Sequence, residues 1–293
     1  MVCQNVAIIG VGLIGGSIGL ALRQRGLAQR IVGIVRRRES VDDLLKRGVV
    51  TDATTDLSSG VAAAEFIVVC TPVDSISRYV LESARYCPEY AVITDAGSTK
   101  ARIVQEVESG WTQHRIGTQG DFSSASATCR FVGSHPLAGS EKSGYQYAHP
   151  QLLAGRWVVV TPTARSDAQA TERVVAFWQA LGARVQLMAP EDHDRALALT
   201  SHLPHLVASA LAGILPPKWA DLAASGFRDT TRIAAGPPEI WTPIFLHNRS
   251  ALLEALGQFE QQLHRFRQAL GTENAEMLSA LLTQGKSCRD SLA

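Results

Sequence analysis

Short apolar runs alternate with amphipathic stretches from the start of the chain to residue 189. Each run is rich in β-branched residues and bounded by Gly, Pro or Asp, which is typical of strands buried on both faces of a parallel sheet. Strands that alternate with helix-length stretches indicate βαβ units. The predicted strands span 5–9, 31–35, 66–70, 91–95, 130–134, 156–161 and 184–188, and the predicted helices span 14–25, 39–47, 75–86, 99–109 and 167–181.

The pattern changes at Pro190, after which no strand-like run is found and apolar residues recur with helical spacing. A proline followed by acidic residues opens the segment 190–215, as at a helix N-terminus. Further helices are predicted at 251–270 and 272–284. The segment 112–130 is rich in Ser, Thr, Gly and Gln and is predicted to be a loop.

These patterns predict an α/β protein of two domains. A Rossmann-type, doubly wound sheet is expected at 1–189 and an all-α domain at 190–293. A helical region of this length with exposed apolar faces usually packs against a partner copy. We therefore expect a homodimer formed through the helical domain.

Composition and charge narrow the function to small-molecule chemistry. The 293 residues are 46% hydrophobic and carry a net charge of +1, so no basic surface for nucleic acid or an anionic membrane is expected. The apolar N-terminal segment contains several glycines and no basic residues precede it, which argues against a signal peptide or membrane span. Five dispersed cysteines without a CxxC pair indicate reduced thiols in a cytoplasmic protein.

A glycine-rich turn at 10–15, "GVGLIG", fits the GxGxxG pattern. Its first glycine permits a tight turn, the second a close approach to a pyrophosphate, and the third close packing of helix and strand. The turn follows the first strand and opens a helix, whose N-terminal amides favour an anion. We therefore predict a dinucleotide site rather than a merely tight turn, with contacts from Gly10, Gly12, Leu13, Ile14 and Gly15.

The end of the second strand predicts which dinucleotide is bound. An NAD site usually has an acidic residue there for the ribose 2′-hydroxyl, but this chain has Val35 followed by Arg36, Arg37 and Arg38. Guanidinium groups bind a 2′-phosphate by charge-assisted hydrogen bonds. The cluster could also be a solvated basic turn. We predict NADP, with NAD as second choice, and contacts from Val35, Arg36 and Arg37.

Three further segments follow predicted strands, where open α/β sheets bind their ligands. Thr71 and Pro72 follow the strand 66–70 and are predicted to contact the cofactor. Ser98 follows the strand 91–95 and suits either a catalytic hydroxyl or the N-cap of the next helix. His135 follows the strand 130–134. A neutral imidazole there suits a general base, although a histidine satisfying nearby backbone groups is an alternative.

The segments "TSHLPHLVASAL" and "FRDTTRIAAGPPEIWTPIFLHN" complete an ordered set of motifs with GxGxxG, "TPV", "DAGSTK" and "HPLAGSEKSG". This set closely resembles the prephenate/arogenate (cyclohexadienyl) dehydrogenase family of tyrosine biosynthesis, over about residues 5 to 270. Leu137 stands where many members have methionine, a near-isosteric change. Because the sequence ends at Ala293, we expect no appended regulatory domain and inhibition by tyrosine, if any, at the active site.

The resemblance implies roles for individual residues. His135 matches the catalytic histidine that takes the proton of the ring hydroxyl, and Ser98 matches the serine that helps hold that hydroxyl. The implied substrate-binding residues are His202, His205, Arg228, Arg232 and Trp241. Arg228 and Arg232 are four apart and would share one face of a helix, although a surface arginine pair is an alternative. No metal is predicted, because His202 and His205 lack convincing further ligands.

The implied reaction is NAD(P)-dependent oxidative decarboxylation. The substrate would be prephenate, giving 4-hydroxyphenylpyruvate, or arogenate, giving tyrosine. The sequence does not distinguish the two substrates. We name prephenate first, and use of both is the alternative. The alternatives are another Rossmann-plus-helical dehydrogenase, of the β-hydroxyacid or imine reductase type, and a non-catalytic NADP-binding sensor.

Overall fold

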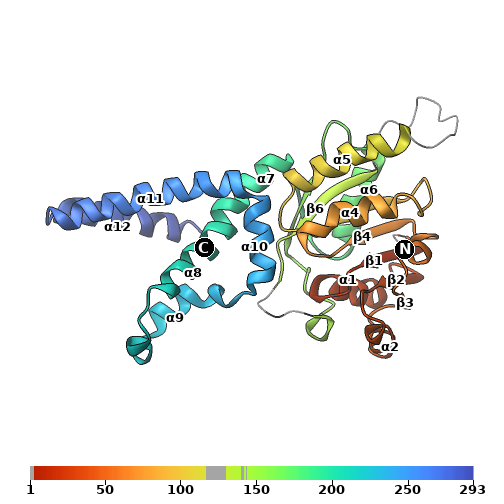
Figure 1. The fold of residues 1–293 in the computed structure, drawn as a ribbon, viewed down its shortest axis with the longest axis horizontal. Helices are drawn as coiled ribbons and strands as arrows, with labels where there is room; N and C mark the ends of the chain where they lie inside the picture. Colours follow the sequence, from red (N-terminus) through yellow and green to blue (C-terminus); the bar gives the residue numbers. More distant parts are fainter. Residues whose placement is uncertain (1–2, 117–129, 140–141, 143, 293) are drawn as a thin grey trace.

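A computed structural model describes residues 3–116, 130–139, 142 and 144–292. Its N-terminal part is one eight-stranded sheet of order β3-β2-β1-β4-β5-β6-β7-β8 (Figure 1). Neighbouring strands are parallel except for the antiparallel pair β6–β7. The strands are β1 (Asn5–Ile9), β2 (Arg30–Ile34), β3 (Asp52–Thr54), β4 (Phe66–Val69), β5 (Val92–Asp95), β6 (Phe131–Pro136), β7 (Trp157–Thr161) and β8 (Arg184–Leu187).

Helices cover both faces of this sheet, and each face has its own apolar core. One core joins the sheet to α1, α2 and α6, and the other joins it to α3, α4 and α5. Most residues of the strands inside the sheet, β2, β1, β4, β5, β6 and β7, are almost fully buried, which explains their apolar runs, whereas the edge strands β3 and β8 are partly exposed. The helices are α1 (Leu13–Gln24), α2 (Glu39–Lys46), α3 (Leu57–Val61), α4 (Val73–Ser83), α5 (Ala101–Ile116) and α6 (Ala168–Ala180).

The predicted fold class is confirmed, with differences in detail. All seven predicted strands form, but β3 and α3 were not predicted, because three and five residues are too short to show a period. The antiparallel β6–β7 pair departs from the predicted parallel sheet. Residues 112–116 belong to α5 and not to the predicted loop, most of which lies outside the described residues.

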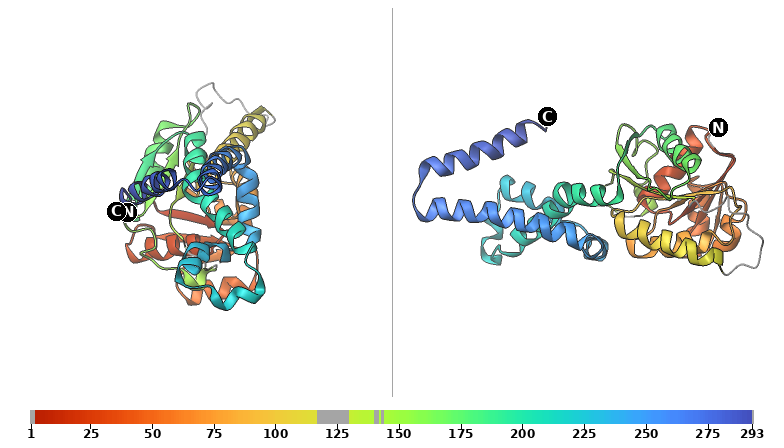
Figure 2. Two further views of the ribbon diagram at one scale, coloured as in Figure 1. Left: turned by 90° about the vertical axis from the view of Figure 1, so that its left-hand side faces the viewer. Right: turned by 90° about the horizontal axis from the view of Figure 1, so that it is seen from above.

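From Pro190 onward the described chain is helical and extends away from the sheet (Figure 2). The predicted helix 190–215 is divided into α7, a π-helical segment at Ala198–His202, and α8. Two 3₁₀ helices span Pro217–Leu222 and Arg232–Ala235. The α-helices are α7 (Pro190–Leu197), α8 (Leu203–Gly213), α9 (Ser225–Thr231), α10 (Pro238–His247), α11 (Arg249–Gly271) and α12 (Ala275–Asp290).

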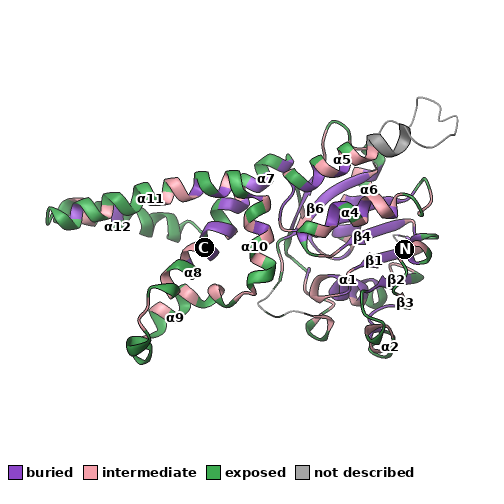
Figure 3. Cartoon of the chain, viewed as in Figure 1, coloured by how far each residue is buried: buried purple, intermediate pink, exposed green. Residues whose placement is uncertain are grey.

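Helices α11 and α12 form the far end of the molecule, and α12 turns back from the end of α11 (Figure 2). Most of their residues are exposed in the single chain (Figure 3). Large apolar side chains are among them: Leu253, Leu263, Leu270 and Leu282 are each at least half exposed. No helix in the described part of the chain is long and apolar enough to cross a membrane.

Candidate active site

A cleft of about 740 Å³ lies between the sheet and the helical part of the chain. The segment after β5 and the end of β6 line one side. The π-helical segment, α8, the 3₁₀ helix Arg232–Ala235 and α10 line the other. Six of the predicted site residues meet there: Ser98, His135, His202, His205, Arg232 and Trp241.

Arg228 does not line this cleft. It is exposed on α9, where its Nε donates a hydrogen bond to the backbone oxygen of Ala223 at 2.8 Å. Helix α9 ends at Thr231 and a 3₁₀ helix with three residues per turn begins at Arg232. The two arginines are therefore not held on one face of a single α-helix. A role for Arg228 in substrate binding stays a prediction.

His135 belongs to a strand and not to a loop after it. β6 extends to Pro136, and His135 pairs with Val159 of the antiparallel strand β7. The predicted strand ended at residue 134 because a proline follows closely and prolines are rare in strands. The sequence placed His135 in irregular structure, but the pairing with β7 fixes its backbone in a strand.

A hydrogen-bonded chain of three residues orients the His135 ring. His193 Nδ1 lies 2.7 Å from Asp194 Oδ1, and His193 Nε2 lies 2.9 Å from His135 Nδ1. A carboxylate accepts, so His193 carries its proton on Nδ1 and accepts at Nε2. His135 must then donate from Nδ1. Its Nε2 is left with a lone pair, as a general base requires.

The environment keeps His135 neutral. Burial and the nearby His193, Lys100 and His202 lower the pKa of His135 well below its ordinary value. The ring is therefore unprotonated at neutral pH and ready to accept a proton. The sequence did not reveal this chain of hydrogen bonds, because it joins residues 58 positions apart.

A buried ion pair lies beneath the site. Lys100 and Asp95 are both fully buried and paired, and Lys100 Nζ also donates to the Ser134 oxygen at 2.9 Å. Asp95 further accepts from the backbone N–H groups of Gly97 and Ser134. These bonds fix the turn that carries Ser98 against the strand that carries His135. The sequence did not reveal the pair, since lysines are rarely buried.

Asp194 also ties the two sides of the cleft together. Its carboxylate accepts hydrogen bonds from the backbone N–H groups of Lys100 at 2.8 Å and Ala101 at 2.9 Å, at the start of α5. A carboxylate is favourable at a helix N-terminus, where these amides lack partners. Helix α5 is therefore capped by a residue of α7, and not by Ser98, which lines the cleft instead.

On the helical side, His205 and Trp241 form a stack. Their ring centroids are 3.6 Å apart with an interplanar angle of 14°. A Cβ added at Gly236 would lie 2.6 Å from Trp241 Nε1 and 2.9 Å from His205 Cε1, so only glycine fits against this pair. The stack gives the cleft a flat apolar wall suited to a ring-shaped ligand.

The glycine-rich turn fits a dinucleotide. Gly10 has φ +88°, and a Cβ at Gly15 would lie 2.3 Å from the Gly10 oxygen, so both positions require glycine. A Cβ at Gly12 would meet no protein atom within 4 Å, so its backbone borders open space. Leu13 and Ile14 begin α1, which leaves their amides available to an anion.

The neighbouring predicted cofactor residues lie around this turn. Val35 is buried just after β2, and the side chains of Arg36, Arg37 and Arg38 are exposed. Within the described residues, no ion pair involves these three arginines. Thr71 packs against Gly10, and Pro72 precedes α4.

The buried histidines predict a loss of stability in acid. Burial lowers the pKa of His202 to about 4, so the folded state excludes a proton that the unfolded state binds below pH 6.5. The free energy of unfolding should therefore fall as pH drops from 6.5 to 4, by about 3 kcal/mol from His202 alone. Urea unfolding at several pH values measures this, and His202→Gln should flatten the dependence. Equal stability at pH 7 and pH 4.5 would contradict it.

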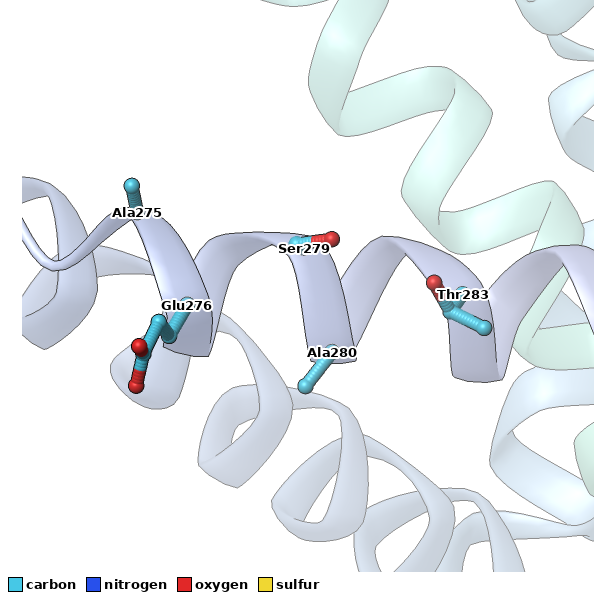
Figure 4. Close-up of a pocket in the computed structure, with 5 residues that line it drawn as sticks. All are labelled: Ala275, Glu276, Ser279, Ala280 and Thr283. Carbon is cyan, nitrogen blue, oxygen red and sulfur yellow. The ribbon is translucent and has the colours of Figure 1, made fainter.

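A second, shallow hollow lies on the surface of α12, where all the lining residues are exposed (Figure 4). It is lined by the mainly small residues Ala275, Glu276, Ser279, Ala280 and Thr283 and has none of the chemistry of the first. Within the described residues, no group of three or more His, Cys, Asp or Glu is placed to hold a metal ion.

Family models match nearly the whole chain. The nucleotide-binding domain of prephenate dehydrogenase matches residues 18–120 and 121–187, and the dimerization domain of prephenate dehydrogenase matches residues 189–284. Prephenate dehydrogenase of Bacillus subtilis is 34% identical over 99% of this chain and 76% of its own length. Cyclohexadienyl dehydrogenase of Zymomonas mobilis is 31% identical over 98% of this chain and 96% of its own length.

Solved structures agree with these matches. Prephenate dehydrogenase of Aquifex aeolicus, in complex with hydroxyphenyl propionate and NAD⁺, has a TM-score of 0.87 and 32% identity, covering 99% of this chain and 98% of its own. Arogenate dehydrogenase of Synechocystis has a TM-score of 0.81 and 30% identity, covering 99% of this chain and 100% of its own. With its nucleotide-binding sheet, its helical second part and the histidine-lined cleft between them, the chain belongs to the prephenate dehydrogenase family of oxidoreductases.

Proposed function

We propose that this protein oxidatively decarboxylates prephenate, or arogenate, with NADP⁺ as its preferred oxidant. One observation carries the proposal. The hydrogen-bonded chain from Asp194 through His193 leaves the lone pair of His135 on Nε2, in a cleft that also contains Ser98 and Arg232. Such a base suits a substrate whose hydroxyl-bearing carbon loses hydride.

In the proposed mechanism, His135 Nε2 takes the proton of the ring hydroxyl. Ser98 holds that hydroxyl beside His135. When NADP⁺ is bound, its nicotinamide would supply the acceptor for the hydride that leaves the same carbon. The bond from the ring to its carboxylate then breaks and CO₂ leaves, because the electron pair completes an aromatic ring. The protonated His135 returns its proton to the phenolate oxygen, which gives the hydroxyl of the product.

Arg232 is proposed to orient a substrate carboxylate. It is exposed at the rim of the cleft, where water weakens its field. An arginine in this position fixes direction by its hydrogen bonds. It also avoids stabilising strongly a carboxylate that must depart as CO₂. The flat His205–Trp241 wall then supports the substrate ring.

The dinucleotide would be held by the turn at Gly10, Gly12 and Gly15 and by the N-terminus of α1. The chain has no acidic side chain at Val35 to hold a ribose 2′-hydroxyl, and Arg36 follows directly. This arrangement favours NADP over NAD. NAD remains the alternative, since the Aquifex aeolicus relative was crystallised with NAD⁺.

The helical region from residue 190 is proposed to form a homodimer and to supply the substrate side of the cleft, while residues 1–189 hold the cofactor. The exposed leucines of α11 and α12 support this assembly. So does the match of residues 189–284 to a dimerization domain. A cytoplasmic location is proposed because the described cysteines, Cys3, Cys70, Cys87 and Cys288, are free thiols.

The test is absorbance of the reduced nicotinamide with prephenate or arogenate and NAD⁺ or NADP⁺, in all four pairings. Arg36→Ala should lower kcat/KM for NADP⁺ by about 10- to 100-fold, because a charge-assisted hydrogen bond is worth about 1.5–3 kcal/mol. The value for NAD⁺ should not fall. Arg289→Ala, which removes the same charge on α12, is the control. Absence of turnover in all four pairings would refute the proposed reaction, and equal losses with both cofactors would refute the role of Arg36.

A further inference from the structure

Asn248 is a buried polar residue between α10 and α11, with 4% of its surface exposed. It occupies the N-cap position of α11, where an asparagine usually accepts a hydrogen bond from the first turn of its helix. Asn248 makes no such bond. By contrast, Asn274 at the start of α12 accepts from Met277 N at 2.9 Å. The Asn248 side chain therefore serves another purpose.

Its amide nitrogen faces two atoms across the domain. Nδ2 donates to the backbone oxygen of Asp194 at 2.7 Å and lies 3.0 Å from His202 Nδ1. A backbone oxygen only accepts, so it selects the orientation in which Nδ2, and not Oδ1, faces Asp194. The second hydrogen of Nδ2 is then directed to His202. His202 Nδ1 must accept that hydrogen and cannot carry a proton of its own.

A neutral imidazole carries one proton, so His202 holds it on Nε2. His202 is 1% exposed and lines the cleft, and Nε2 has no hydrogen-bond partner among the described residues. A buried donor without a partner is unfavourable unless a ligand supplies an acceptor. Its other ring nitrogen is already satisfied, which leaves Nε2 as the group available to a ligand.

We propose that Asn248 is a positioning residue that holds His202 as an Nε2–H donor to an oxygen of the bound substrate. The part that concerns the substrate rests on the proposed function, and the part that concerns the tautomer does not. The Nε2 of His202 is then a hydrogen-bond donor, whereas the Nε2 of His135 is an acceptor. Both depend on Asp194: its carboxylate orients His193, and its backbone oxygen orients Asn248.

This arrangement suits a decarboxylation. Before the reaction both rings are neutral, so they orient a substrate oxygen without placing a permanent positive charge beside the carboxylate that leaves. A cation in the place of His202 would stabilise a carboxylate against departure. A neutral donor directs the oxygen and leaves the electron pair of the breaking bond free to move into the ring.

The experiment is ¹⁵N NMR of the histidine rings in the full-length protein, with His202→Gln to assign the signals. In the wild type, His202 should show a protonated Nε2 and an unprotonated Nδ1. Asn248→Asp keeps the shape but replaces the donor with a carboxylate, so His202 Nδ1 should become protonated. We expect kcat/KM to fall about 10- to 100-fold, as for loss of one hydrogen bond to a reacting ligand.

Two controls separate positioning from structure. Asn274→Asp changes a true N-cap and should alter neither the His202 signals nor kcat/KM. In the His202→Gln background, Asn248→Asp should cost less than about threefold, because glutamine has no tautomer to set. A protonated Nδ1 in the wild type would overturn the proposal, as would an equal loss in both backgrounds. If the wild type turned over no cyclohexadiene, the proposed function would fail while the NMR result still decided the tautomer.

Discussion

Replacement of His135 with asparagine is expected to lower kcat by about 10²- to 10⁴-fold, the usual contribution of a general base. Asparagine can still donate a hydrogen bond toward His193, but it has no basic nitrogen to accept the substrate proton. Binding of NADP⁺ should change little, since the glycine-rich turn follows β1, whereas His135 belongs to β6. Steady-state kinetics, with titration of NADP⁺ by fluorescence, measure both quantities.

The matched control is His264→Asn, which changes an exposed histidine of α11 and should leave kcat unaltered. His193→Asn should give a smaller loss than His135→Asn, because it removes only the group that orients the base. An unchanged kcat in His135→Asn, with the fold intact by circular dichroism, would exclude His135 as the base.

Replacement of Lys100 with methionine should lower the free energy of unfolding by about 3–5 kcal/mol. The side chains of Lys100 and Asp95 have no exposed surface, so in this variant Asp95 would remain buried without its counter-ion. The double variant Asp95→Asn, Lys100→Met should regain more than half of the loss, because no charge is left unpaired. Chemical unfolding in guanidinium measures all three proteins.

Lys286→Met provides the comparison, since the Lys286–Asp290 pair is more than half exposed on α12. Exposed pairs contribute about 0–1 kcal/mol, so this variant should unfold almost as the wild type does. A loss of under 1 kcal/mol in Lys100→Met would show that the buried pair is not needed for stability.

The central strands were predictable because burial on both faces of a sheet requires a continuous run of mostly apolar residues. The run at β4 is apolar throughout, the run at β1 is apolar after Asn5, and the glycine-rich turn marks where β1 passes into α1. The direction of β7 was not predictable. A strand covered by helices has the same apolar run whether its neighbour is parallel or antiparallel, and only the path of the chain distinguishes them.

The same distinction applies to the site. His135, Ser98, His202, His205, Arg232 and Trp241 were identifiable one by one, from strand ends and from resemblance, and the fold brings them to one cleft. A turn of 3₁₀ helix, which leaves no clear pattern in the sequence, interrupts the expected pairing of Arg228 with Arg232. Sequence spacing thus predicted shared faces only where a helix was regular.

The sequence by itself therefore determined which chemical groups are available: the imidazoles, the arginines after β2 and the glycine-rich turn around Gly12. The protonation pattern of the histidines depends on contacts between distant segments. Asp194 is next to His193 in the sequence, but His135 is 58 residues from His193, and Asn248 is 46 residues from His202. Hydrogen bonds act over about 3 Å in space whatever the separation along the chain. Only the packed structure could therefore assign one ring as acceptor and the other as donor.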